Sequence, residues 1–349
     1  MLRRSVLAMM FILLVLTGLA SADPTDDFVK ARLDEFNLPG LSLAVTRNGE
    51  VVKAEGYGLA DRDRKMPATR DTVYKIGSVS KQFVATGIML LVQENRLSLD
   101  AAIGKYLEGA PSSWGPITIR HLLTHTSGLV RESPAFTPFT NRPDAELIRA
   151  LHAVPLLFMP GQKWEYCNSG YVALAEIIRI VTQQQWTEYL TQKIFAPAGM
   201  TATMPTNTTV TVPNRALGYA GQDNKRKADE WVALRASGAF LSTVLDLAKW
   251  DALLYTDKIL SEGARRQMWA KVRLNDGTTA SYGLGWHVDS ARRGLRLWHG
   301  GGLPGFTSHF VRYVDDGVSV VVLANGDDGD VGSIANGVAA LYLPAATRK

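Results

Sequence analysis

The sequence of 349 residues has a single cysteine, Cys167, so no intrachain disulfide can form. Its six histidines are scattered, and no cysteine or histidine cluster has the spacing of metal ligands. Internal repeats and low-complexity tracts are absent as well. We therefore expect neither a metal nor a cofactor, and the 46% hydrophobic and 20% charged residues are typical of a globular chain.

No apolar run is long enough for a comfortable membrane span. The apolar residues 6–16 follow Arg3 and Arg4 and precede a small-residue site that ends at Ala22, which is the pattern of a cleavable secretory signal. We predict that residues 1–22 form a signal peptide, cleaved after Ala22, and that the mature protein is secreted or periplasmic without stable membrane insertion. An uncleaved anchor is the alternative.

A large excess of one charge is also lacking. The chain has 38 basic and 33 acidic residues, a net charge of +5. The predicted signal peptide carries two arginines and no acidic residue, so its removal leaves 36 basic against 33 acidic residues. This mild balance requires no nucleic-acid partner, and we expect none.

Strand signals lie near both ends of the chain. Residues 41–46 and 51–57 are β-leaning apolar runs, and the Asn48-Gly49 pair between them is a hairpin signal. Further β-leaning runs return near the C-terminus at residues 284–288, 295–299, 308–314 and 318–325. Between these two regions the signals are those of helices and long loops.

We therefore predict an α/β (α+β) fold with one antiparallel sheet, built from distant segments and flanked by helices. The sheet part covers about residues 23–98 and 230–349, and a mostly helical insert covers about residues 99–229. Together they form one domain over residues 23–349. We expect a functional site in the cleft between the two parts.

Ser78 and Lys81 stand three residues apart at the start of a predicted helix over residues 79–93, so on a helix they share a face. A serine hydroxyl is a poor nucleophile until a base takes its proton, and a lysine one turn away can be that base. The plainer interpretation is a solvated helix start, with Ser78 as the N-cap and Lys81 as a surface charge.

Two further polar clusters lie downstream. Tyr166 and Asn168 precede a predicted helix; a tyrosine can relay protons and an asparagine amide can hold a substrate carbonyl, but the segment also fits a capping loop with Asn168 as the N-cap. His299 precedes three glycines, residues 300–302, at the end of a predicted strand, where the backbone can approach a ligand. A glycine-rich turn with a packed, hydrogen-bonded His299 fits equally.

Together the three clusters resemble the serine β-lactamase and penicillin-binding protein superfamily, in its class C β-lactamase-like and DD-peptidase-like branch, which includes related carboxylesterases. That family is marked by Ser-x-x-Lys, Tyr-x-Asn and a Lys/His-Thr/Ser-Gly strand, which correspond here to residues 78–81, 166–168 and 299–301. The flanking segments 117–129, 160–171, 238–243 and 282–286 are similar to the family too. The resemblance implies a β-lactamase/transpeptidase-like fold.

The resemblance further implies acyl transfer through an acyl-enzyme on Ser78, with Lys81 and Tyr166 as one coupled base. The oxyanion hole would be formed by the backbone N–H groups of Ser78 and Gly302. Substrate binding would fall to Asn168, His299, Gly300 and Gly301. For Lys81 to act as a base near neutral pH, its pKa must be lowered by burial, by the helix dipole and by a second cation such as His299.

Gly300 stands where penicillin-recognising relatives usually carry threonine or serine, whose hydroxyl helps to bind a substrate carboxylate. We therefore expect a carboxylesterase-like enzyme acting on small acyl esters or amides, with weak or no turnover of cephalosporins. The export signal favours instead a β-lactamase, a D-alanyl-D-alanine carboxypeptidase or a D-aminopeptidase acting on β-lactams or D-amino-acid peptides. A non-catalytic peptide-binding relative is a further alternative, although such proteins commonly lose the serine or the lysine.

Overall fold

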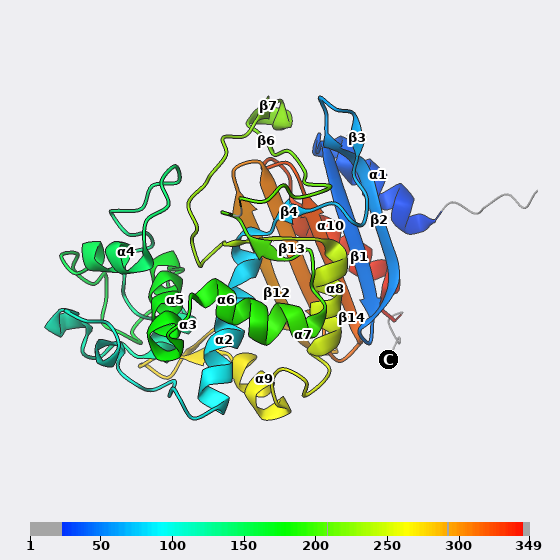
Figure 1. The fold of residues 1–349 in the computed structure, drawn as a ribbon. Coiled ribbons are helices and arrows are strands. Elements are labelled where there is room, and N and C mark those ends of the chain that lie inside the picture. Colours follow the sequence, from blue (N-terminus) through cyan, green and yellow to red (C-terminus); the bar gives the residue numbers. More distant parts are fainter. Residues whose placement is uncertain (1–22, 208, 292, 345–349) are drawn as a thin grey trace, which may run out of the picture.

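The computed structural model describes residues 23–207, 209–291 and 293–344, and its centre is a seven-stranded antiparallel sheet (Figure 1). Its strands are β1 (Gly40–Arg47), β2 (Glu50–Asp61), β3 (Met66–Pro67), β11 (His287–Ala291), β12 (Gly294–Leu303), β13 (Phe306–Tyr313) and β14 (Val318–Ala324). Their order in the sheet is β11-β12-β13-β14-β1-β2-β3, so the N-terminal hairpin joins the C-terminal strands through the pairing of β1 with β14. The predicted fold class is confirmed.

The central strands β1 and β14 are buried on both faces, which explains why most of their residues are apolar. Every residue of β14 is buried, as is all of β1 except Arg47. One predicted strand is partly wrong, because residues 284–286 precede β11 and form an irregular segment whose side chains Leu284 and Trp286 fill the core. Gly285, at φ +77°, turns the chain there against the backbone of Lys81.

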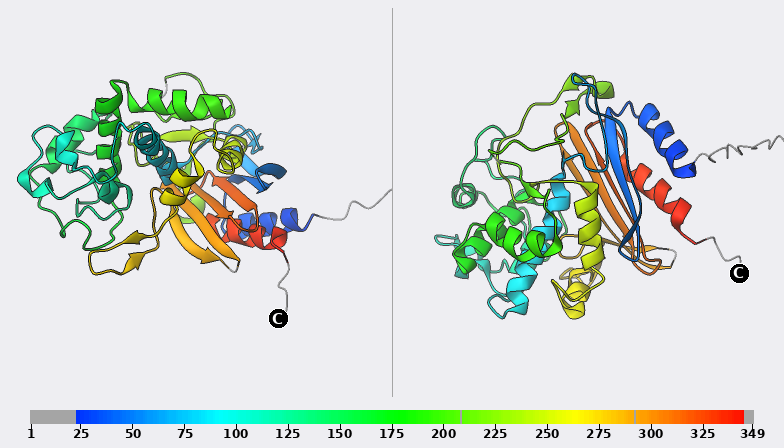
Figure 2. Two further views of the ribbon diagram at one scale, coloured as in Figure 1. Left: turned by 90° about the horizontal axis from the view of Figure 1, so that it is seen from below. Right: turned by 45° about the vertical axis from the view of Figure 1, so that its right-hand side comes forward.

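Two terminal helices cover one face of the sheet. Helices α1 (Pro24–Glu35) and α10 (Val331–Tyr342) lie side by side there (Figure 2) and bury an apolar layer that includes Val29, Val320 and Ile334. The two helices approach closely, because a methyl group on Gly337 would lie 2.2 Å from the Phe28 ring. Distant ends of the sequence are thereby joined in one layer.

The opposite face of the sheet carries the larger core, which encloses helix α2 (Lys81–Gln93) and helix α8 (Val244–Leu253). Every residue of α2 from Lys81 to Leu91 is buried, and a 3₁₀ turn, η1 (Gly77–Ser80), precedes it. The predicted helix over residues 79–93 is therefore confirmed from residue 81 onward. Its first two residues belong to the tighter 3₁₀ turn.

The remaining elements lie mostly on the α2 side of the sheet (Figure 1). The other α-helices are α3 (Ile119–Leu123), α4 (Asp144–Leu151), α5 (Asn168–Thr182), α6 (Trp186–Leu190), α7 (Ala196–Ala198) and α9 (Glu262–Met268). The short strands are β4 (Tyr74–Lys75), β5 (Met204–Pro205), β6 (Tyr219–Ala220), β7 (Arg226–Lys227), β8 (Phe240–Ser242), β9 (Val272–Arg273) and β10 (Thr279–Ala280). Short helical turns span Ile103–Lys105, Ser112–Trp114, Thr191–Phe195 and Gln222–Asn224.

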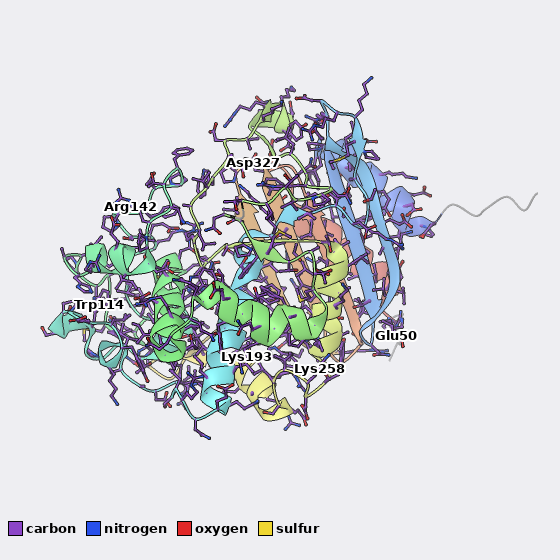
Figure 3. All side chains as sticks on the ribbon, viewed as in Figure 1. Glu50, Trp114, Arg142, Lys193, Lys258 and Asp327 are labelled. Atoms are coloured by element: carbon purple, nitrogen blue, oxygen red, sulfur yellow. The ribbon has the colours of Figure 1, made fainter. Side chains whose placement is uncertain are left out.

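Helix α2 lies between the region of α3 to α6 and the seven-stranded sheet (Figure 1), and one core cluster includes residues from both sides. Trp114 and Arg142 lie in the part built from α3 to α6, whereas Glu50 marks the β1–β2 turn at the opposite edge (Figure 3).

Cys167 is a free, buried thiol. Among the described residues, no helix combines the length and the apolar character that a membrane span requires. The predicted signal peptide, residues 1–22, lies outside the described residues.

Candidate active site

Ser78 and Lys81 lie where η1 passes into α2, and their side chains meet. The Lys81 amino group and the Ser78 hydroxyl form a hydrogen bond of 3.1 Å. The Lys81 side chain is fully buried, and the residue before η1, Ile76, offers no side-chain cap. The plainer interpretation, a surface lysine beside a capping serine, is therefore wrong.

Lys81 has two further hydrogen-bond acceptors, the Asn168 side-chain oxygen at 2.9 Å and the Ser237 carbonyl oxygen at 2.8 Å. Burial lowers the pKa of Lys81 well below its usual 10.5, and the positive charge of Arg235 lowers it further. This favours the neutral amine, which can accept a proton from Ser78.

Tyr166 faces the same pair of residues. Its hydroxyl lies near Ser78, and its ring centroid lies 4.7 Å from the Lys81 nitrogen. Burial raises the pKa of the Tyr166 hydroxyl, and the neighbouring Ser78 hydroxyl only partly offsets this rise. The phenol therefore remains protonated where Lys81 tends to be neutral.

His125 holds the loop that carries Tyr166. Its carbonyl oxygen accepts a hydrogen bond of 2.9 Å from the Glu165 N–H, and its Nδ1 accepts one of 3.2 Å from the Cys167 N–H. Its ring packs against Tyr166 and Tyr282, at centroid distances of 4.3 and 4.7 Å. His125 was not among the predicted site residues, since its contacts join segments about 40 residues apart.

Asn168 is the first residue of α5, and its side chain is used inside the site. The N-cap residue is Cys167, without a side-chain cap bond, so the capping alternative for Asn168 is wrong. The Asn168 amide nitrogen donates to the Glu132 carboxylate, which also pairs with Arg235 at 2.7 Å. No local pattern around Glu132 or Arg235 marks them, because both lie in irregular segments.

The glycine segment of β12 packs directly on η1. A methyl group on Gly301 would lie 2.2 Å from the Ile76 carbonyl oxygen and 2.9 Å from the Ser78 nitrogen, so only glycine fits. Ser308 on the neighbouring strand donates to the same Ile76 oxygen at 2.8 Å. A methyl group on Gly302, by contrast, would face open space.

His299 is buried, with 2% of its surface exposed. Its Nδ1–H donates to the Gly300 carbonyl oxygen at 2.6 Å, and its Nε2 accepts from the Tyr282 hydroxyl at 2.9 Å. Burial lowers the pKa of His299 well below its usual 6.5, with a further contribution from Lys81. His299 therefore does not supply the second cation expected from the sequence, and Arg235 supplies it instead.

The close packing of Gly301 gives a direct test. Gly301→Ala should cost about 1–3 kcal/mol of stability, because the new methyl group must displace the backbone of Ile76 or Ser78. Gly302→Ala is the matched control and should change stability by less than about 0.5 kcal/mol. Denaturant unfolding measures both; equal stabilities would show that β12 does not hold η1 in place.

An antiparallel sheet, a buried serine–lysine pair at the start of a core helix and a Tyr-x-Asn loop define a class, the β-lactamase-type and penicillin-binding-type proteins. Residues 25–343 match the beta-lactamase family, and the chain belongs to this family of serine hydrolases. The resemblance found in the sequence is confirmed.

Known relatives agree with this assignment. Penicillin-binding protein 4* of Bacillus subtilis is 31% identical over 313 residues, which cover 80% of this chain and 68% of that protein. Other curated relatives are matched over 63% of their length. An octameric penicillin-binding protein homologue from Pyrococcus abyssi has a TM-score of 0.80 at 27% identity, covering 91% of this chain and 76% of that one. D-amino acid amidase from Ochrobactrum anthropi, solved with L-phenylalanine, has a TM-score of 0.78 at 26% identity, covering 91% and 98%.

Proposed function

We propose that this protein hydrolyses small acyl esters or amides through an acyl-enzyme on Ser78. The observation that carries the proposal is the 3.1 Å contact between a fully buried lysine and the serine hydroxyl. A buried amine with a lowered pKa is the base that a serine nucleophile requires. A non-catalytic binding protein would have no use for such a pair, whose burial is unfavourable for stability.

The proposed reaction begins when Lys81 takes the Ser78 proton and the serine oxygen attacks the substrate carbonyl. The backbone N–H groups of Ser78 and Gly302 hold the resulting oxyanion, each contributing about 3 kcal/mol to transition-state stabilisation. Tyr166, as a neutral phenol beside both residues, gives its proton to the leaving group and takes the serine proton from Lys81 in return. Water then attacks the acyl-enzyme with the same groups in reversed roles.

Small esters and amides are favoured over carboxylate-bearing substrates because position 300 lacks the hydroxyl that would help to bind a substrate carboxylate. Gly300 offers no hydroxyl, and both ring nitrogens of the neutral His299 already have protein partners. The predicted substrate-binding role of His299 is thus reduced to orienting the strand. Gly300 and Gly301 would bind the substrate only through their backbone.

A second candidate, hydrolysis of D-amino-acid amides or peptides, has support of its own. The Glu132 carboxylate sits one third exposed beside Asn168 and has the charge to accept a substrate ammonium group. The likeness to D-amino acid amidase, at 26% identity over 91% of the chain, points the same way.

A substrate panel on protein lacking residues 1–22 tests the ranking. We expect turnover of short p-nitrophenyl esters, and weak or no turnover of nitrocefin and of D-Ala-D-Ala peptides. D- and L-amino-acid amides in the same panel address the second candidate, which predicts a preference for the D-amides. A nitrocefin rate well above the ester rate would reverse the ranking in favour of a β-lactamase.

Position 300 should control the choice of substrate. A methyl group on Gly300 would meet His309 and Ser308 at 3.7 Å, an ordinary contact, so a larger side chain fits. Gly300→Thr should raise kcat/KM for carboxylate-bearing substrates relative to neutral esters by about tenfold, since it adds one hydrogen bond to a charged group. Gly300→Val has the same shape without the hydroxyl and is the control. Equal ratios in the two variants would show that no carboxylate binds there.

Two side chains of opposite charge should tune the pH dependence. Lys81 must be neutral to act, so kcat/KM falls as the pH drops through its pKa. Arg235 lowers that pKa and Glu132 raises it, so Arg235→Gln should move the acidic limb to higher pH and Glu132→Gln should move it to lower pH. Steady-state pH profiles of the two variants measure the two shifts. Shifts in the same direction would contradict the assignment of Lys81 as the base.

We also propose that the mature protein is exported after cleavage at Ala22, on the strength of the N-terminal pattern. N-terminal sequencing of the protein recovered from the periplasm or the medium tests this. An intact Met1 on exported protein would favour the uncleaved anchor.

A further inference from the structure

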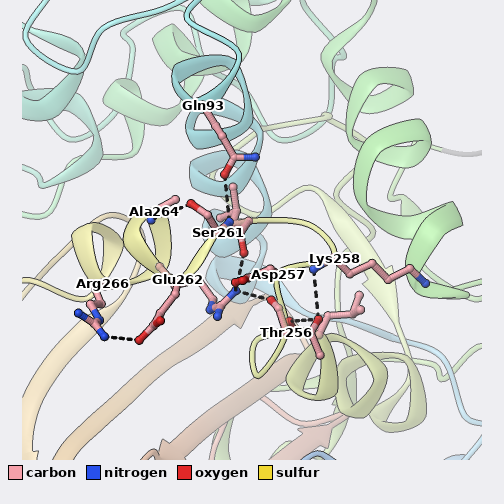
Figure 4. Close-up of polar contacts among 11 residues, drawn as sticks. Gln93, Thr256, Asp257, Lys258, Ser261, Glu262, Ala264 and Arg266 are labelled. Carbon is pink, nitrogen blue, oxygen red and sulfur yellow. Dashed lines mark hydrogen bonds and ion pairs between the residues drawn. The ribbon is translucent and has the colours of Figure 1, made fainter.

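A pocket of about 590 Å³ lies near the end of α2 that is opposite Ser78. It is lined by the end of α8, by α9 and by the ends of β12 and β13 that meet near residues 295 and 314. Ser261, the N-cap of α9, donates its backbone N–H to the side chain of Gln93, the last residue of α2 (Figure 4). Because α2 has 13 residues, about 20 Å of helix separates this pocket from the catalytic serine.

The pocket contains an arginine whose hydrogen bonds are incomplete. Arg312 is fully buried, and its Nε donates to the Asp251 carboxylate at 2.6 Å. Its guanidinium group lies against the rings of Tyr255 and Trp269, at 4.8 and 5.4 Å from their centroids. Among the described residues, neither Nη1 nor Nη2 has a hydrogen-bond acceptor, and the Trp269 indole nitrogen has none either.

Such donors are expensive to leave without partners. A buried donor that lacks an acceptor costs about 1–3 kcal/mol, and more when the group is charged. Four of them, two on Arg312 and one each on Trp269 and the Tyr255 hydroxyl, occur on residues that line the same pocket. This concentration of donors points to an acceptor that enters from outside the chain.

The other charged groups around the pocket already have partners. Arg265 pairs with Asp257 at 3.0 Å, and Arg266 pairs with Glu262 (Figure 4). The carboxylate of Asp315 accepts the Leu295 N–H at 2.7 Å. The donors of Arg312 and Trp269, with the Tyr255 hydroxyl, are therefore the groups left for a ligand.

We propose that this pocket binds a small organic carboxylate. Its two oxygens would accept from Nη1 and Nη2 of Arg312, because the planar guanidinium fork matches a carboxylate. The apolar lining residues Leu254, Leu295 and Val314 suit a short hydrocarbon body. A free cation is excluded from this position, since the Arg312 guanidinium is positively charged and, like the Trp269 indole, only donates hydrogen bonds.

Calorimetric titration of the purified protein with sodium benzoate tests the proposal, with benzyl alcohol as the neutral probe and inorganic phosphate as the other anion. We expect saturable 1:1 binding of benzoate, about tenfold or more tighter than either of the other probes. In the ¹⁵N-tryptophan NMR spectrum the indole signal that Trp269→Phe removes should shift with benzoate. Absence of saturable binding would mean that only water occupies the pocket, and equal or tighter binding of benzyl alcohol or phosphate would also overturn the proposal.

Variants locate the site. Arg312→Met should abolish benzoate binding, but removal of a buried charge leaves Asp251 without its partner and can prevent folding. Val314→Glu therefore places a negative charge at the pocket wall, and Val314→Gln is its uncharged match. We expect Glu to weaken benzoate binding about tenfold relative to Gln, with ester hydrolysis at Ser78 unchanged in both. Equal affinities in the two variants would place the benzoate elsewhere.

Discussion

Ser78→Ala should abolish turnover of every substrate in the panel, together with labelling by a fluorophosphonate or penicillin probe. The variant lacks the oxygen that forms the acyl-enzyme, while Lys81, Tyr166 and Asn168 keep their places. Loss of a nucleophile of this kind lowers kcat by roughly 10⁴-fold or more. Intact-mass spectrometry after probe treatment, with initial rates on the best ester, measures both effects.

Ser80 provides the matched control, because it belongs to the same 3₁₀ turn but points elsewhere. Its hydroxyl oxygen accepts a hydrogen bond of 3.2 Å from the Phe240 N–H. Ser80→Ala should therefore lose about 1 kcal/mol of stability and keep the labelling. Full turnover or labelling in a well-folded Ser78→Ala variant would reject Ser78 as the nucleophile.

The sheet could be predicted because its signals are local. The run from Val318 to Ala324 is apolar except for Ser319, and Asn48-Gly49 supplies the turn that joins β1 to β2, with Gly49 at φ +83°. Irregular segments carry no such signal. The apolar residues 284–286 are indistinguishable from a strand in the sequence, and only their packing against α2 shows that Gly285 bends the chain.

The candidate site was only partly visible in the sequence. Short motifs identify Ser78, Lys81, Tyr166 and Asn168, since each motif lies within four residues. The groups that set the proton affinity of Lys81 lie far from it in the chain: Arg235 is about 150 residues away and reaches the site through Glu132 and Asn168. A lone arginine in an irregular segment gives no sequence signal. The prediction therefore assigned the role of the second cation near Lys81 to His299 instead of Arg235.

Lys81→Met should reduce ester hydrolysis by about 10²–10⁴-fold, the usual contribution of a general base. Methionine matches the length of the lysine stem but cannot accept the Ser78 proton, so the rate of fluorophosphonate labelling should fall in parallel although Ser78 is present. Lys105→Met removes an exposed lysine and is the control. Unchanged labelling in Lys81→Met would assign the base to another group.

The same variant should change how stability depends on pH. In the unfolded chain Lys81 binds a proton up to a pH near 10.5, whereas in the native protein burial lowers its pKa well below that value. Between these two pKa values the unfolded state binds more protons than the native state. The free energy of unfolding therefore rises with pH in this range, and this contribution of Lys81 is lost as the pH falls. The difference in unfolding free energy, wild type minus Lys81→Met, should therefore increase from neutral pH toward pH 10.5. Urea unfolding at several pH values measures this difference. A difference that stays constant or decreases would show that Lys81 is protonated in the native protein. Lys81 could then not act as the base.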